Sequence, residues 1–94
     1  MIEPLTADER AAFLADHPDW DLEGETISRT FTFADFGEAM GFVTRIALAA
    51  EAADHHPDID IRWNRVTLAL STHSAGALTG LDRDLASSID GFAP

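Results

Sequence analysis

Two stretches of alternating apolar and polar residues, one on each side of a long helical pattern, restrict most strongly what this chain can fold into. In the first stretch, residues 26–33, the apolar side chains that share one parity are Ile27, Phe31 and Phe33. This alternation indicates a strand with one buried face. Gly24, together with Glu25, separates it from a short strand-like run at residues 21–23. The sequence therefore predicts a hairpin that turns at Gly24 or Glu25.

The segment from 35 to 54 carries the main helix. Asp35 followed by Glu38 marks a helix start. The apolar residues that then recur at helical spacing are Ala39, Phe42, Val43, Ile46, Ala47, Ala50 and Ala53. A second stripe, more apolar than a solvated face requires, holds Met40, Thr44, Leu48 and Ala52. We therefore expect this second face to form a subunit interface.

The second alternating stretch follows Pro57 and predicts another hairpin. Its first strand carries Ile59, Ile61 and Trp63 on one parity, Asn64 and Arg65 interrupt it, and its second strand carries Val66, Leu68 and Leu70.

Two capping-box patterns place the remaining helices. Thr6 with Glu9 begins a first helix that stops before Pro18, and Thr79 with Asp82 begins the last helix. The resulting order is α-β-β-α-β-β-α. It predicts a single α+β domain spanning 1–94, with a four-stranded antiparallel sheet, helices on one face and the other face open.

Charge and composition exclude several classes of function. Six basic and seventeen acidic residues give a net charge of 6 − 17 = −11, which repels nucleic-acid phosphates and anionic lipid surfaces. The chain has no cysteine, so thiolate sites and disulfides are excluded. Without a secretory signal or a long apolar run, it is expected in the cytoplasm, with no membrane and no nucleic-acid partner. At 94 residues it buries limited surface, which favours an oligomer.

Three of the four histidines lie between Glu51 and His73, and this cluster is the candidate site. Imidazoles near carboxylates are typical of acid–base chemistry or of metal binding. Glu51 and His55 are four residues apart, so a helix that continues to His55 would let Glu51 orient that ring. Pro57 directs His56 elsewhere. His73 has the parity opposite to the apolar residues, so it should point away from the core, whereas the fourth histidine, before Pro18, is typical of a structural helix end.

The motif set resembles the pterin-4a-carbinolamine dehydratase family. The residues that carry the resemblance are Glu51, His55, His56, Pro57, Trp63, Asn64, Ser71, Thr72, His73 and Asp82. Trp20 and the segments 31–36 and 42–48 also resemble family sequence, so the similarity covers nearly the whole chain.

The resemblance implies a lyase that removes water from 4a-hydroxytetrahydropterin to give quinonoid dihydropterin, a step in tetrahydrobiopterin recycling. It implies a homodimer or homotetramer that needs no metal and no cofactor, because the pterin is the substrate. The implied acid–base groups are His55, His56 and His73, with Glu51 and Asp82 as orienting carboxylates. The implied substrate-binding residues are Asp54, Pro57, Thr72, Ser74, Ala75 and Asp82. We expect His55 to lie nearest the leaving hydroxyl, because Glu51 can stabilise its cation.

Two other classes of function stay open at this point. Glu51, His55, His56 and His73 could together ligate zinc in a hydrolase, although adjacent histidines at a helix end diverge and no familiar zinc-hydrolase spacing is present. Alternatively, the chain is a non-catalytic dimerisation or coactivator module that uses the long helix. Metal analysis of the purified protein tests the zinc-hydrolase class, and a dehydration assay tests the non-catalytic class.

Overall fold

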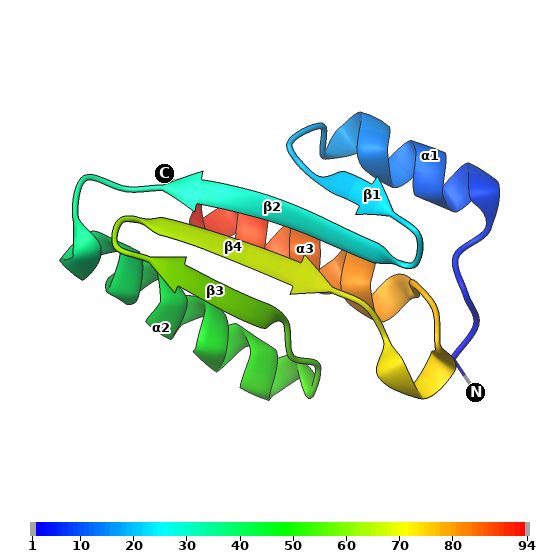
Figure 1. The fold of residues 1–94 in the computed structure, drawn as a ribbon. Helices are drawn as coiled ribbons and strands as arrows, with labels where there is room; N and C mark the ends of the chain where they lie inside the picture. The colour runs from blue at the N-terminus through cyan, green and yellow to red at the C-terminus, as the bar shows by residue number, and fades with distance from the viewer. Residues whose placement is uncertain (1, 94) are drawn as a thin grey trace.

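The strands form one antiparallel sheet in the order β1-β2-β4-β3 (Figure 1). Their bounds are Asp21–Glu23 for β1, Thr26–Thr32 for β2, Asp58–Arg62 for β3 and Arg65–Leu70 for β4. The computed structural model describes residues 2–93. β2 lies beside β4, with Ile27 opposite Leu70 and Phe31 opposite Val66. The α+β class, the strand number and the antiparallel arrangement predicted from sequence are confirmed.

The helices begin where the capping patterns predict. Their bounds are Ala7–Asp16 for α1, Phe36–Ala53 for α2 and Gly80–Phe92 for α3, with a short 3₁₀ turn, η1, at His73–Ala75. Both capping boxes form, because the hydroxyls of Thr6 and Thr79 and the carboxylates three residues later satisfy backbone amides at each helix start. The element order is therefore the predicted one.

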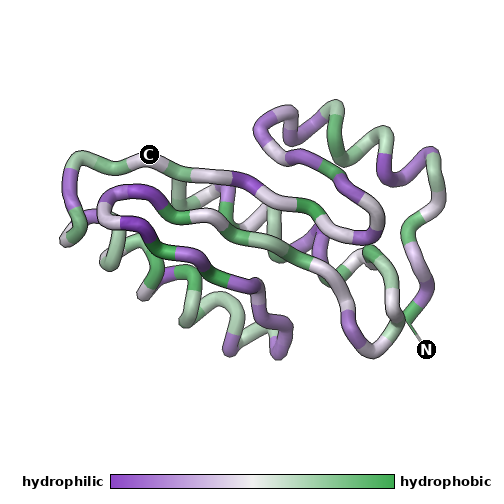
Figure 2. Tube along the Cα trace, in the orientation of Figure 1, coloured by the Kyte–Doolittle hydropathy of each residue, from purple (hydrophilic) through white to green (hydrophobic). Residues whose placement is uncertain are grey.

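α2 and α3 cover one face of the sheet (Figure 1). The hydrophobic core lies between these two helices and the sheet. Apolar and polar residues alternate along the strands (Figure 2), and in β2 and β4 Ile27, Phe31, Val66, Leu68 and Leu70 are buried. Ile46 of α2, Leu68 of β4 and Ile89 of α3 are fully buried, and each such side chain contributes about 1.5–3 kcal/mol through burial. On the open face, the hydroxyls of Thr30 and Thr67 lie 2.9 Å apart. The open face is thus polar, as the alternation requires.

The turn between β3 and β4 differs from the sequence prediction. Trp63 was expected to continue the apolar face of the strand, but β3 ends at Arg62 and Arg65 already belongs to β4. Trp63 takes a left-handed conformation with φ of 50° and is 66% exposed. Asn64 fixes the turn, because its side-chain amide donates to the Phe33 carbonyl at 2.8 Å. An alternation pattern does not show where a strand stops when the turn residue itself is apolar.

A salt bridge between Arg10 and Glu25 holds the N-terminal segment against the first hairpin and the loop before α3. The guanidinium contacts both carboxylate oxygens of Glu25, at 2.6 and 3.1 Å, and the Leu78 amide donates to the same carboxylate at 3.1 Å. The Arg10 hydrogen bonds, then the Leu78 amide, hold the pKa of Glu25 below its usual range, and Glu25 raises the pKa of Arg10. This exposed salt bridge, with the Leu78 hydrogen bond to Glu25, fixes the loop that leads into α3.

No helix within residues 2–93 is long and apolar enough to cross a membrane.

Candidate active site

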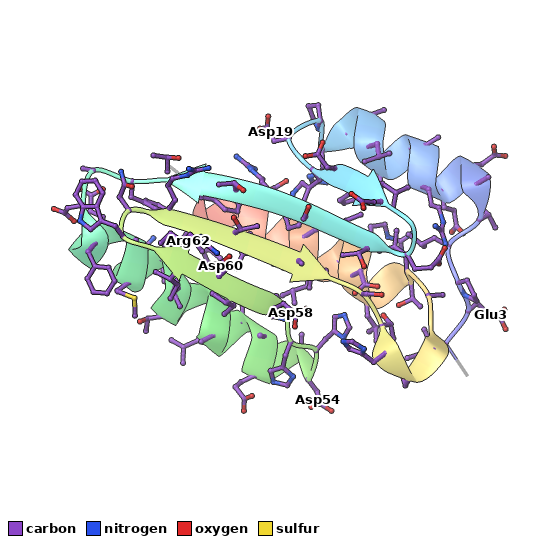
Figure 3. All side chains as sticks on the ribbon, viewed as in Figure 1. Glu3, Asp19, Asp54, Asp58, Asp60 and Arg62 are labelled. Carbon is purple, nitrogen blue, oxygen red and sulfur yellow. The ribbon has the colours of Figure 1, made fainter. Side chains whose placement is uncertain are left out.

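The candidate site forms where α2 ends and α3 begins, because the loops after α2 and β4 lie at the same end of the molecule (Figure 1). α2 stops because Asp54 takes a left-handed conformation with φ of 51°, and its amide caps the carbonyls of Ala50 and Glu51. Figure 3 labels Asp54 at this helix end, and Asp58 at the start of β3 follows the loop. The chain turns sharply here, so His55 and His56 lie in different environments.

His55 points into the protein and pairs with a buried carboxylate. The residue is 9% exposed, and its Nε2 lies 2.5 Å from Oδ1 of Asp82, which is 0% exposed. A hydrogen bond in which one partner is ionised is roughly twice as strong as a neutral one, and a buried position strengthens it further. Asp82 therefore fixes the orientation of the His55 ring.

Asp82 is itself held in place by the start of α3. Its Oδ2 accepts the Thr79 amide at 2.9 Å and the Thr72 hydroxyl at 2.8 Å, and the Thr72 and Thr79 hydroxyls lie 2.8 Å apart. The N-terminus of a helix also favours a negative charge. Within residues 2–93, every fully buried side-chain nitrogen or oxygen has a hydrogen-bond partner. The Asp82 carboxylate thus both caps the start of α3 and pairs with His55.

The predicted pairing of Glu51 with His55 is wrong. Glu51 instead contacts His56, with 2.6 Å between its Oε1 and the His56 Nε2. The i, i+4 argument required the helix to continue through His55, but the left-handed Asp54 ends it one residue earlier. His56 and Glu51 are both exposed, so their pair is weaker than the buried pair of His55 with Asp82. The carboxylate that pairs with His55 is therefore Asp82.

The third histidine, His73, begins η1 and is exposed, as its strand parity predicts. It lines a cavity of about 510 Å³ together with both other histidines, and pockets of about 300–1,000 Å³ are typical of small-molecule sites. The full lining is Ile2, Ala53, Asp54, His55, His56, Ser71, Thr72, His73, Ser74 and Leu81. The structure thus brings together three imidazoles from two loops at one open cavity.

Only some of the residues predicted to bind the substrate line the cavity. Asp54, Thr72 and Ser74 line it, whereas Pro57 and Ala75 are absent from its lining. Asp82 supports the wall from the interior through His55. The roles assigned to all of these residues stay predictions.

Four residues that line the cavity were not predicted as site residues: Ile2, Ala53, Ser71 and Leu81. Ser71 belongs to the motif that carries the family resemblance, and Leu81 lies beside Asp82 in the sequence, so both positions carried a signal. Thr79 was recognised as a helix cap, but its link to the imidazole through Asp82 depends on the folded chain.

Within residues 2–93, no group of three or more histidine, aspartate or glutamate side chains is arranged to hold a metal ion. The carboxylates are instead paired one to one with His55 and His56. The donor set therefore fits paired acid–base groups better than a metal centre, although independence from metal stays a prediction.

Comparison with known proteins identifies the family. The family model for pterin 4 alpha carbinolamine dehydratase matches residues 3–92. This chain belongs to the pterin-4-alpha-carbinolamine dehydratase family. Relatives that carry this enzyme name provisionally include a chain from Chloroflexus aurantiacus, 58% identical over 86 residues and covering 92% of each chain. Another, from Nocardia farcinica, is 55% identical over 94 residues and covers 99% of each chain.

Two solved structures share the family fold. The crystal structure of a transcriptional coactivator/pterin dehydratase from Brucella melitensis has a TM-score of 0.93 and 37% identity, over 98% of this chain and all of the other. A pterin dehydratase-like protein described as a RuBisCO assembly factor of the alpha-carboxysome has a TM-score of 0.65 and 20% identity, over 79% of this chain and 86% of the other. The second likeness shows the fold alone.

Proposed function

We propose that this chain dehydrates 4a-hydroxytetrahydropterin to quinonoid dihydropterin. The observation that carries the proposal is the buried pair of His55 and Asp82 at the wall of a cavity of about 510 Å³, which His56 and His73 also line. Membership of the family supports the same activity. A physiological role in tetrahydrobiopterin recycling follows if an aromatic hydroxylase supplies the substrate.

The enzyme has to supply only proton transfers for this elimination. The bond between C4a and its hydroxyl oxygen breaks, and the oxygen leaves with the electron pair as water after it takes a proton. The neighbouring ring nitrogen loses its proton, and the electron pair left on nitrogen forms the new C=N bond. The step is redox-neutral and consumes no other reagent. General acid–base catalysis contributes about 10²–10⁴-fold.

We assign the acid to His55 and the base to His73. The Asp82 carboxylate accepts the His55 Nε2–H and fixes the ring at the cavity wall, and in the proposed step His55 donates a proton to the leaving hydroxyl. His73 is exposed at the cavity and can accept the nitrogen-bound proton. His56, oriented by Glu51, is the third proton-transfer group. We assign binding of the pterin ring to Asp54, Thr72 and Ser74, which line the cavity.

The test is the dehydration rate of purified His55→Ala and His73→Ala. Each should lower turnover at least tenfold with unchanged circular dichroism, because loss of one proton-transfer group removes part of the ~10²–10⁴-fold acid–base contribution. Glu23→Ala, an exposed residue of β1, is the matched control and should keep wild-type turnover. Wild-type rates in both histidine variants would remove these residues from the mechanism.

A non-catalytic role is the second candidate, and one surface favours it. The second face of α2 is exposed, with Leu48 at 68%, and Ile59 on the neighbouring β3 is 38% exposed. We propose that a second copy of the chain covers Met40, Thr44, Leu48 and Ala52 in a homodimer or homotetramer, since exposed apolar patches mark interaction sites. The Brucella relative is described as a transcriptional coactivator as well as a dehydratase. An inactive chain that still assembles would support this role alone.

A further inference from the structure

The fourth histidine, His17, lies outside the cavity and joins the end of α1 to α3. Its Nδ1 lies 2.6 Å from Oδ2 of Asp90, and its Nε2 lies 3.2 Å from the hydroxyl oxygen of Ser87. Ser87 and Asp90 are three residues apart on α3, so they share a helix face. The three side chains therefore form a continuous chain of hydroxyl, imidazole and carboxylate, although they come from opposite ends of the sequence.

Asp90 is fixed by two further donors, and this fixes the imidazole in turn. The Trp20 indole donates to Asp90 Oδ1 at 2.8 Å and Arg29 donates to the same oxygen at 2.7 Å. The other oxygen, Oδ2, then accepts from the Nδ1–H of His17. The Nε2 lone pair of that tautomer faces the Ser87 hydroxyl. The His17 ring also stacks on Phe13, with 4.8 Å between ring centroids.

Ser87 is accessible to a small molecule. It is exposed and lines a cavity of about 220 Å³ between α1 and α3, with Phe13 and Ala12 as its apolar wall. Arg83 lies one turn before Ser87 on α3 and lines the same cavity. Its guanidinium contacts the Asp84 carboxylate at 3.3 Å and lies 3.8 Å from that of Glu9, so it is held by these acidic groups rather than by Ser87.

We propose that Ser87, His17 and Asp90 form a nucleophilic centre that takes an acyl group from small activated esters. The arrangement has the parts that an activated serine requires: a nucleophile, a base within hydrogen-bond reach, and a carboxylate that orients the base. This centre uses α1 and the second half of α3, so it does not depend on the proposed dehydration.

The chemistry balances without another reagent. The Ser87 oxygen bonds to the acyl carbon while its proton passes to His17 Nε2, and the bond from the acyl carbon to the ester oxygen breaks with its electron pair on the leaving alkoxide or phenolate. His17 then gives its proton to that leaving group or to water. In the second step, water attacks the acyl-serine with His17 as base. Serine is regenerated and the acid is released.

The experiment exposes the full chain to p-nitrophenyl acetate and locates acetyl groups by peptide mass spectrometry. Site-resolved detection is needed because the other three histidines can also react with this ester. Ser88 is the matched internal control: it neighbours Ser87 on the same exposed helix, but its hydroxyl bonds to the Asp84 carbonyl at 3.2 Å. Ser87 should be acetylated at least tenfold faster than Ser88.

The variant His17→Gln tests whether the imidazole acts on the serine. It removes the base, whereas Trp20 and Arg29 still hold Asp90, so circular dichroism should stay unchanged. Acetylation of Ser87 should fall at least tenfold, within the ~10²–10⁴-fold that a general base contributes. Equal labelling of Ser87 and Ser88, or Ser87 labelling that survives His17→Gln in the folded variant, would overturn the proposal.

Discussion

Replacing Asp82 by asparagine should lower dehydration while the fold persists. The change keeps the shape of the side chain but removes the negative charge that faces His55 Nε2 at 2.5 Å. The amide oxygen of asparagine can still accept the Thr79 amide, which now bonds to the carboxylate at 2.9 Å. The helix cap should therefore survive, and the loss should fall on the imidazole.

The magnitude follows from the lost hydrogen bond. A hydrogen bond to a charged group contributes about 1.5–3 kcal/mol. Since about 1.4 kcal/mol is a tenfold change in rate, kcat/KM should fall roughly 10- to 150-fold. The loss should be larger in kcat than in KM, because His55 transfers its proton in the chemical step and not in substrate binding.

The assay is the initial rate of 4a-hydroxytetrahydropterin dehydration across a range of pH, alongside circular dichroism. Asp84→Asn on the same helix is the matched control, because the Asp84 side chain is 77% exposed and does not line the cavity. A folded Asp82→Asn protein with wild-type kcat/KM would refute the role of the buried pair.

Three further predictions address metal, assembly and acid stability. Chelation should leave dehydration unchanged, and activity that falls with EDTA and returns with zinc would favour a hydrolase. Leu48→Glu should shift sedimentation toward smaller species, whereas Ala11→Glu on the exposed face of α1 should not; an unchanged mass would place the interface elsewhere. The Arg10 and Leu78 hydrogen bonds hold the pKa of Glu25 low, so its stabilisation is complete above the ordinary value of 4.5 and is lost as pH falls through the lowered pKa. The Tm difference between wild type and Glu25→Gln should therefore shrink from about pH 6 to about pH 3, and a constant difference would contradict this.

Local signals in the sequence were sufficient for the helix starts and the order of the elements. Thr6 with Glu9 and Thr79 with Asp82 are three residues apart, so each capping box can form within a single turn, whatever the rest of the chain does. The strand parities likewise depend only on neighbouring residues. This is why the helix starts and the element order could be predicted before the structure.

The partners in the site depend on information that local patterns lack. The contact of His55 with Asp82 spans 27 residues, and that of Ser87 with His17 spans 70. Whether Glu51 meets His55 or His56 depends on the backbone angle of one residue, Asp54. The sequence therefore predicted that the histidines lie together, and the family resemblance indicated which carboxylates orient them. Only the folded chain shows which carboxylate pairs with which imidazole.

The left-handed Asp54 also determines how this protein can vary. Because that residue turns the chain, the first imidazole after it enters the interior and the second stays outside, beside Glu51. Inserting one residue between Asp54 and His55 would move His55 out of the interior position, although no side chain in the motif had been replaced. The segment from α2 to β3 should therefore tolerate some substitutions but no change of length. The turn at Trp63, at the far end of the same hairpin, should accept insertions much more readily.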